Sequence, residues 1–158
     1  MIVRKAEWRD LPEIATLVRM HYDSTGFTAD VEYDAERVHH SLTLYLLASE
    51  CQMFVATASS EDRSPAEVDQ LMGVLAVQES DTFFSLDRAA RELFLYIKPE
   101  FRGQHAGVAM IRMAEDWARS KGMQSIIIGN HPLSPPHVAV TYKRHGYREA
   151  QTDFIKRL

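Results

Sequence analysis

The sequence predicts an α/β domain in which strands and helices alternate along the chain. Three observations predict this class. Apolar residues recur at helical spacing in several stretches, and apolar runs of strand length separate those stretches. A glycine-containing turn also joins one such run to the longest amphipathic stretch. Because 158 residues can bury a two- or three-layer core, we expect a single domain over residues 1–158.

The first half of the chain is expected to contain two helices between strands. Residues 2–6 form a short strand, and Asp10 and Asp34 then each offer a cap to a stretch with apolar residues at helical spacing. Two strands follow, residues 53–58 and 71–78, and the polar segment between them has the composition of a hairpin loop.

The second half is expected to begin with a strand over residues 92–97, followed by the longest amphipathic helix. Residues 125–129 contain three consecutive isoleucines, which predict a strand covered on both faces, central in the sheet and parallel to a neighbour. A last helix near residues 136–145 ends at a glycine, and residues 147–156 are expected to close the domain with a strand.

Composition and charge exclude several classes of protein. The hydrophobic fraction of 46% and the charged fraction of 25% are those of an ordinary globular domain. A net charge of −4 without a basic stripe argues against nucleic-acid binding. No apolar run approaches the ~20 residues that span a bilayer, and no secretory h-region is present, so we expect no membrane partner and a cytoplasmic location. Cys51, the sole cysteine, indicates a buried thiol and not a catalytic one.

The turn between the strand at 92–97 and the following helix is suited to binding an anion. It consists of Arg102-Gly103-Gln104-His105-Ala106-Gly107. Glycine lets a ligand approach the backbone, and the first N–H groups of a helix lack intrahelical partners and carry partial positive charge. The turn lacks the Gly-Lys-Ser/Thr ending of a nucleotide triphosphate loop and the third glycine of the dinucleotide fingerprint, so those two classes are disfavoured.

Together with residues 95–101, this turn resembles the acyl-CoA pyrophosphate signature of the GNAT acetyltransferase superfamily, Val-x-Pro-x-x-Arg-Gly-x-Gly-x-Gly/Ala. His105 departs from the signature, because it stands where the second glycine is usual. The resemblance implies that acetyl-CoA is the co-substrate. The residues that would bind it are Leu95, Tyr96, Ile97, Arg102, Gly103, Gln104, His105, Ala106, Gly107, Val108 and Asn130.

The resemblance covers nearly the whole chain, because the expected element order β-α-α-β-β-β-α-β-α-β is that of the GNAT fold. It implies an α/β (α+β) architecture with a central mixed, mostly antiparallel twisted sheet. That sheet would have six to seven strands and about four flanking helices.

Residues 140–147 resemble the closing motif of the same family, in which a helix ends Tyr-x-x-x-Gly-Phe/Tyr. By this resemblance Tyr142 is the catalytic residue that protonates the departing thiolate. A phenol with a reference pKa of about 10 keeps its proton at neutral pH and can donate it. The alternative is a tyrosine that only packs at a helix end. Pro135 and Val138 replace the usual asparagine and alanine of the motif, so the helix is expected to start later than usual.

A general base is also expected, because an amine acceptor is mostly protonated at pH 7. Glu92 is the candidate, as the acid in the strand that leads to the anion-binding turn. Strict alternation would place it on the same face as Tyr96, so its direction depends on whether the strand bulges. His21, His131 and His137 are further candidates, because the pKa of histidine lies near neutrality.

No metal site is predicted. His39 and His40 are adjacent, and His137 is a further histidine, but no carboxylate or cysteine accompanies them at ligand spacing.

By the resemblance, residues 21–34 form a lip over the thioester and select the acceptor. The acids of this segment, Asp23, Asp30, Glu32 and Asp34, together with the aromatic residues Tyr22, Phe27 and Tyr33, would suit a cationic amine by charge attraction and cation–π contact. The alternative is that Asp34 only caps a helix and the other acids are solvated.

The sequence therefore predicts an N-acetyltransferase that moves an acetyl group from acetyl-CoA to a primary amine of a small molecule or peptide. Two alternatives remain open. One is a protein acetyltransferase acting on a lysine or an amino terminus, and the other is a non-catalytic module that binds acyl-CoA. A homodimer is compatible with the sequence.

Overall fold

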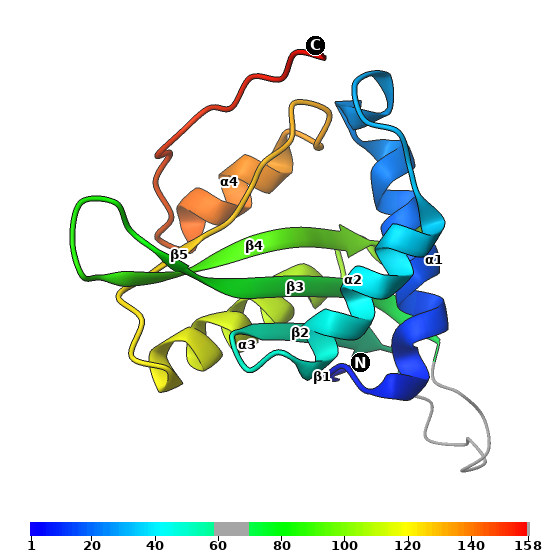
Figure 1. Ribbon diagram of the computed structural model, residues 1–158, viewed down its shortest axis with the longest axis horizontal. Coiled ribbons are helices and arrows are strands. Elements are labelled where there is room, and N and C mark those ends of the chain that lie inside the picture. The colour runs from blue at the N-terminus through cyan, green and yellow to red at the C-terminus, as the bar shows by residue number, and fades with distance from the viewer. Residues whose placement is uncertain (59–69, 158) are drawn as a thin grey trace.

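A computed structural model describes residues 1–58 and 70–157. Within these residues one sheet has five strands in the order β1-β2-β3-β4-β5. The strands are β1 (Ile2–Lys5), β2 (Cys51–Thr57), β3 (Leu71–Asp81), β4 (Arg88–Ile97) and β5 (Ser125–Ile127). The pairs from β1 to β4 are antiparallel, and β4 pairs with β5 in parallel. The sheet is therefore mixed and mostly antiparallel, as predicted (Figure 1).

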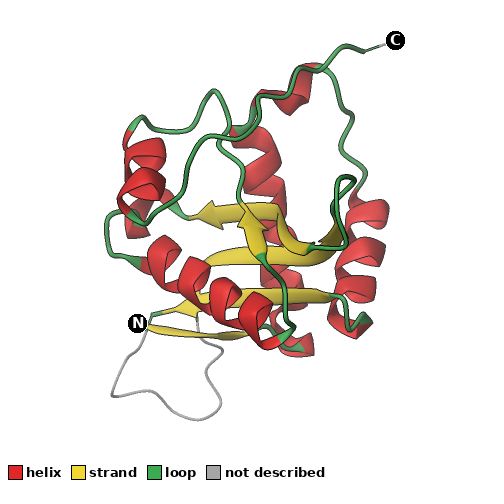
Figure 2. Ribbon diagram, turned by 90° about the vertical axis from the view of Figure 1, so that its left-hand side faces the viewer, coloured by secondary structure: helices red, strands yellow, loops and turns green. Residues whose placement is uncertain are grey.

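Four α-helices flank this sheet in the described part of the chain: α1 (Leu11–Ser24), α2 (Ala35–Leu47), α3 (Ala106–Ser120) and α4 (His137–Arg144). Short 3-10 turns η1 (Trp8–Asp10), η2 (Gly26–Ala29) and η3 (Pro99–Phe101) connect some of the elements. Apolar residues of α3 form a core with one face of the sheet, whereas α1 and α2 form a second core with the other face. Figure 2 shows the sheet held between these helical layers.

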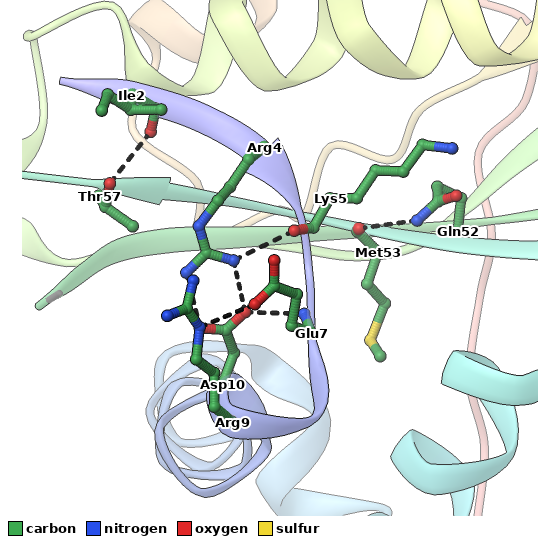
Figure 3. A network of polar contacts seen from close by, with 9 residues as sticks. All are labelled: Ile2, Arg4, Lys5, Glu7, Arg9, Asp10, Gln52, Met53 and Thr57. Atoms are coloured by element: carbon green, nitrogen blue, oxygen red, sulfur yellow. Dashed lines mark hydrogen bonds and ion pairs between the residues drawn. The ribbon is translucent and has the colours of Figure 1, made fainter. Parts of the chain in front are cut away.

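An ion pair fixes the start of α1 against β1. Both terminal guanidinium nitrogens of Arg4 donate to the carboxylate of Asp10, at 2.7 and 2.8 Å, and the Glu7 backbone N–H donates to the same carboxylate at 2.8 Å (Figure 3). Burial alone would raise the pKa of Asp10, but these hydrogen bonds and the charge of Arg4 hold that pKa below its usual range. Asp10 does precede α1 as predicted, yet its carboxylate is occupied by Arg4 and Glu7 and makes no hydrogen bond that caps this helix. Asp34 caps α2 as predicted, by accepting from Arg37 N at 2.9 Å.

A second ion pair ties α1 to the end of β4, where the anion-binding turn begins. The Lys98 ammonium lies 2.8 Å from the Glu13 carboxylate, which also accepts the Leu71 backbone N–H at 3.0 Å. The neighbouring Gly73 must be glycine, because an added Cβ would lie 2.6 Å from the Tyr96 carbonyl oxygen. The end of β4 is thus held in place from two sides.

A β-bulge interrupts the pairing of β3 with β4. Val77 pairs with Glu92 and Ala76 pairs with Phe94, so Leu93 is the extra residue on β4. Alternation of side chains therefore changes phase at this point. Phe94 belongs to the core on the α1 and α2 face, whereas Glu92 is separated from it by the bulge and lines a cavity.

Two predictions about the sheet were wrong. The strand expected at 125–129 covers only Ser125–Ile127 and lies at the edge of the sheet, with Ile127 36% exposed, although it is parallel to its neighbour as predicted. Residues 147–156, expected as strand, form no regular structure and run from α4 along the outside of the fold (Figure 1). The sheet described therefore has five strands and not six or seven. The predicted hairpin loop between β2 and β3 falls mostly outside the described residues.

Candidate active site

A cavity of about 430 Å³ opens between β4, the C-terminal end of α1, the turn before α3, and α4. It brings together most of the residues that the sequence singled out. The predicted catalytic and cofactor-binding residues that line it are Glu92, Leu95, Tyr96, Ile97, Arg102, Gly103, His105, Ala106, Gly107, Val108 and Tyr142. Gln104 and Asn130 lie outside this lining and are exposed, and the Gln104 side-chain amide donates to the Glu100 carbonyl at 3.4 Å.

The turn before α3 lines the cavity with residues whose backbone N–H groups have no intrahelical partner. The first helical N–H with an intrahelical partner is that of Ala109, which donates to the His105 carbonyl at 3.0 Å. The N–H groups of residues 106–108 precede it in the first turn of α3, where helix geometry provides no carbonyl. An added Cβ on Gly107 would meet nothing nearer than 3.9 Å, so the cavity approaches the backbone closely here. This arrangement suits a bound anion.

His105 adopts a left-handed backbone conformation, which favours glycine. Its φ of 63° is the one positive φ of a non-glycine residue in the described ranges, and Gly103 nearby has a φ of 82°. Left-handed geometry costs a non-glycine residue roughly 1–2 kcal/mol, although histidine adopts it more readily than most. The His105 side chain is exposed, and the turn accommodates a histidine where the family signature has glycine.

Arg102 is positioned by the end of β4. Its Nε donates to the Ile97 carbonyl at 3.2 Å, and its guanidinium carbon lies 5.9 Å from the centre of the Tyr96 ring. A guanidinium has five N–H donors, so this single bond leaves others able to reach an anion in the cavity.

Glu92 enters the cavity where β4 and β5 separate. The parallel pairing ends at Arg91 and Ile127, and beyond it the Glu92 carboxylate accepts the Gly129 backbone N–H at 2.8 Å. The carboxylate thus takes the place of a backbone carbonyl of β4 as the acceptor for this N–H. Burial raises the pKa of Glu92 to about 7, and the bond from Gly129 opposes that rise only in part. Glu92 can therefore exchange a proton near neutral pH.

Tyr142 lines the same cavity from α4. Burial raises the pKa of its phenol, and the neighbouring charge of Glu92 raises it further, so the phenol stays protonated at neutral pH. Its ring packs 5.9 Å from that of Tyr147, whose hydroxyl donates to the Glu115 carboxylate at 2.8 Å. Tyr147 thereby holds the end of α4 against α3. This helix begins at His137, after Pro135 and Pro136, close to the position predicted for the last helix.

Histidines form the end of the cavity next to α1. His21 and His131 both line it, with their rings 5.4 Å apart. Burial lowers the pKa of His21 to about 4, and His131 contributes to the shift. Burial also lowers the pKa of His131 itself. Both imidazoles are therefore neutral at pH 7, and His21 is a weak base. His137 lines the cavity as well.

The acids predicted to select a cationic acceptor are not in the lining. Asp23 pairs with Arg19 at 3.0 Å, and Asp34 caps α2. Asp30 and Glu32 line no part of the cavity. The structure therefore supports the alternative for this segment: Asp34 is a cap, and residues 21–34 contribute His21, Ser24 and Thr25 to the cavity instead.

The segment between β5 and α4 supplies lining residues that the sequence did not single out, Leu133 and Ser134. Pro135 and Pro136, which precede α4, were the feature of the sequence that could have indicated an irregular segment here.

Across residues 1–58 and 70–157, no cluster of three or more histidine, cysteine or acidic side chains could hold a metal ion. Over the same residues, every helix is too short or too polar to cross a bilayer. Cys51 lies in β2, away from the cavity.

The family model of the acetyltransferase (GNAT) domain matches residues 49–149, more than half of the chain. The chain therefore belongs to the GNAT acetyltransferase family. No curated protein matches it.

Solved structures share the fold over the full length of the chain. AAC(6')-Iy, in complex with the bisubstrate analogue CoA-S-monomethyl-acetylneamine, is 12% identical, with a TM-score of 0.77 over 99% of this chain and 97% of the other. The aminoglycoside 6'-N-acetyltransferase AAC(6')-IG from Acinetobacter haemolyticus is 14% identical, with a TM-score of 0.71 over 100% and 99%. The ribosomal-protein-alanine N-acetyltransferase from Brucella melitensis biovar Abortus 2308 is 16% identical, with a TM-score of 0.68 over 100% of both chains. At these identities the likeness establishes the fold alone.

Proposed function

We propose that the protein transfers the acetyl group of acetyl-CoA to a primary amine by direct attack of the amine on the thioester. One observation carries this proposal. A single cavity is lined by an anion-binding turn, by a carboxylate with a pKa near neutrality, and by a protonated phenol. These are the three groups that such a transfer needs.

The turn before α3 fits the pyrophosphate of coenzyme A. Backbone N–H groups of residues 106–108 and the side chain of Arg102 would hold it, and Gly107 leaves room for close approach. The structural neighbour solved with a coenzyme A analogue has the same fold, which is consistent with this assignment.

Glu92 is proposed as the general base. With a pKa of about 7 it is partly ionised at neutral pH, and it can accept the proton that the attacking amine loses, directly or through a water. His21 is the less suitable candidate, because its pKa of about 4 makes it a much weaker base.

Tyr142 is proposed as the proton donor. As the C–N bond forms and the C–S bond breaks, the phenol O–H donates to the sulfur that leaves as a thiolate. Glu92 gains one proton and Tyr142 loses one in each transfer, so the pair returns to its starting state when a proton passes between them or exchanges with solvent.

The experiment that tests this function is an acetyl-transfer assay with the purified full chain. Acetyl-CoA is incubated with small primary amines and with peptides that carry a free lysine or amino terminus. Release of free thiol and acetylation of the acceptor, detected by mass spectrometry, are expected together. Binding of acetyl-CoA without transfer to any acceptor would instead identify a non-catalytic module, and transfer to peptides alone would identify a protein acetyltransferase.

We expect Tyr142→Phe to lower kcat about 10²-fold while the KM for acetyl-CoA stays nearly unchanged. The variant keeps the ring that packs against Tyr147 and loses only the hydroxyl. Steady-state kinetics at saturating acceptor measure the effect. Tyr147→Phe is the matched control, because it loses a bond to Glu115 outside the proposed chemistry and should cost about 1 kcal/mol of stability with little change in kcat. Wild-type turnover by Tyr142→Phe would show that Tyr142 only packs.

A further inference from the structure

Four aromatic rings form a continuous series at the α1 end of the cavity, and three of them, His131, His21 and Tyr96, line it. Phe27 of η2 lies 5.2 Å from His131, His131 lies 5.4 Å from His21 of α1, and His21 lies 6.0 Å from Tyr96 of β4, measured between ring centres. All three contacts are edge-to-face, with interplanar angles of 88°, 64° and 63°. Edge-to-face contact is a preferred geometry of aromatic pairs. Residues far apart in the sequence thus build one aromatic wall.

This aromatic wall, formed by Phe27, His131, His21 and Tyr96, carries no charge at neutral pH. Burial keeps the two imidazoles neutral, and the other two rings are a phenyl and a phenol. The exposed carboxylates of residues 23–34 do not line the cavity. Among the described lining residues, Glu92 is the one carboxylate, so the cavity can balance one ammonium group near the thioester and no more.

The space available is also limited. The cavity of about 430 Å³ must take the cofactor from its pyrophosphate to its thioester as well as the acceptor. Pockets of ~300–1,000 Å³ usually hold one drug-sized ligand, so the part of the acceptor that enters is small.

We propose that the acceptor is a small primary amine carried on an aromatic ring system, whose ring packs against the imidazoles of His21 and His131 while its amine faces Glu92. This inference rests on the function proposed above. A polyamine or an aminoglycoside would bring additional ammonium groups into a region without countercharge, and desolvation of those groups opposes binding. An acidic acceptor would bring its carboxylate close to that of Glu92.

The test compares kcat/KM for phenethylamine, cyclohexylethylamine, spermidine, kanamycin and glutamate at saturating acetyl-CoA. Cyclohexylethylamine has the same carbon skeleton without aromaticity. We expect phenethylamine to exceed it by about 3- to 10-fold, and to exceed spermidine, kanamycin and glutamate by more than about 10-fold.

Variants of His131 connect this preference to the aromatic wall. His131→Leu should lower kcat/KM for phenethylamine by about 3- to 10-fold, mainly through KM, and leave cyclohexylethylamine and the KM for acetyl-CoA nearly unchanged. His131→Phe should retain the preference, because it keeps a ring. His39→Leu on the exposed face of α2 is the matched control. His131 lies in an irregular segment after β5, so neither His131→Leu nor His131→Phe interrupts a helix or strand.

The two proposals fail in different ways. Transfer to spermidine, kanamycin or glutamate at rates equal to or above that for phenethylamine would overturn the aromatic acceptor and leave the acetyltransferase activity standing. Equal loss for both ring amines in His131→Leu would also overturn it. Absence of transfer to every amine and peptide would overturn both proposals together.

Discussion

Gly107→Glu is expected to abolish measurable binding of acetyl-CoA. The substitution places a carboxylate at the second residue of α3, where the pyrophosphate is proposed to bind, so bulk and negative charge both oppose the ligand. The fold should tolerate it, because an added Cβ at this position has its nearest neighbour, the Ile97 Cγ1, at 3.9 Å. Calorimetric titration of acetyl-CoA into each variant measures the effect.

Arg102→Ala tests the same turn with a smaller change. Loss of one charge-assisted contact should weaken acetyl-CoA binding by about 10- to 100-fold. Arg37→Ala, which removes an exposed arginine on α2, is the matched control and should bind within a few-fold of the wild type. Gly107→Ala adds a methyl group without charge where the ligand is proposed to approach the backbone, so it should weaken binding less than Gly107→Glu does. Unchanged affinity in both Gly107→Glu and Arg102→Ala would exclude this turn as the pyrophosphate site.

Glu92→Gln is expected to lower kcat about 10²- to 10³-fold and to alter the pH dependence of the reaction. Only the carboxylate form of Glu92 accepts a proton, so wild-type kcat/KM should rise as pH increases through about 7. This rise in kcat/KM near pH 7 should be absent in Glu92→Gln. The ionisation of the acceptor amine, with a reference pKa of about 10, lies far enough away to be resolved separately. A wild-type pH profile without a limb near 7, or a variant that retains it, would assign the base to another group.

The same substitution should stabilise the folded protein above neutral pH. Burial raises the pKa of Glu92 from 4.5 to about 7, so the folded state binds the proton more tightly than the unfolded chain. The penalty for its charge is absent below pH 4.5, grows between 4.5 and 7, and is complete above 7, where it is at most about 3 kcal/mol. Thermal unfolding of wild type and Glu92→Gln at pH 5 and pH 8 measures this difference, and a variant less stable at pH 8 would contradict it.

The sequence predicted the elements whose pattern is local. The Asp34 cap, the apolar spacing of the helices, the strands β2 to β4 and the turn from Arg102 to Gly107 all depend on neighbouring residues, and the structure has them at or near the predicted positions. The family signature also identified Tyr142, which does line the cavity.

Other features depend on contacts between distant segments and could not be predicted. The three isoleucines of residues 126–128 suggested a central strand. However, β5 ends at Ile127, the Glu92 carboxylate accepts the Gly129 N–H beyond it, and residues 147–156 form no strand that would cover its edge. The direction of Glu92 depended on a bulge at Leu93 that strand alternation does not reveal. The aromatic wall joins residues 21, 27, 96 and 131, whose proximity no spacing in the sequence indicates.

A crystal structure of the protein with acetyl-CoA tests most directly whether one cavity holds the cofactor and carries out the chemistry. We predict that the pyrophosphate oxygens lie within hydrogen-bond distance of the backbone N–H groups at the start of α3 and of Arg102. We also predict that the thioester lies between Glu92 and Tyr142. A cofactor bound outside this cavity, or a thioester remote from both side chains, would contradict the proposed function.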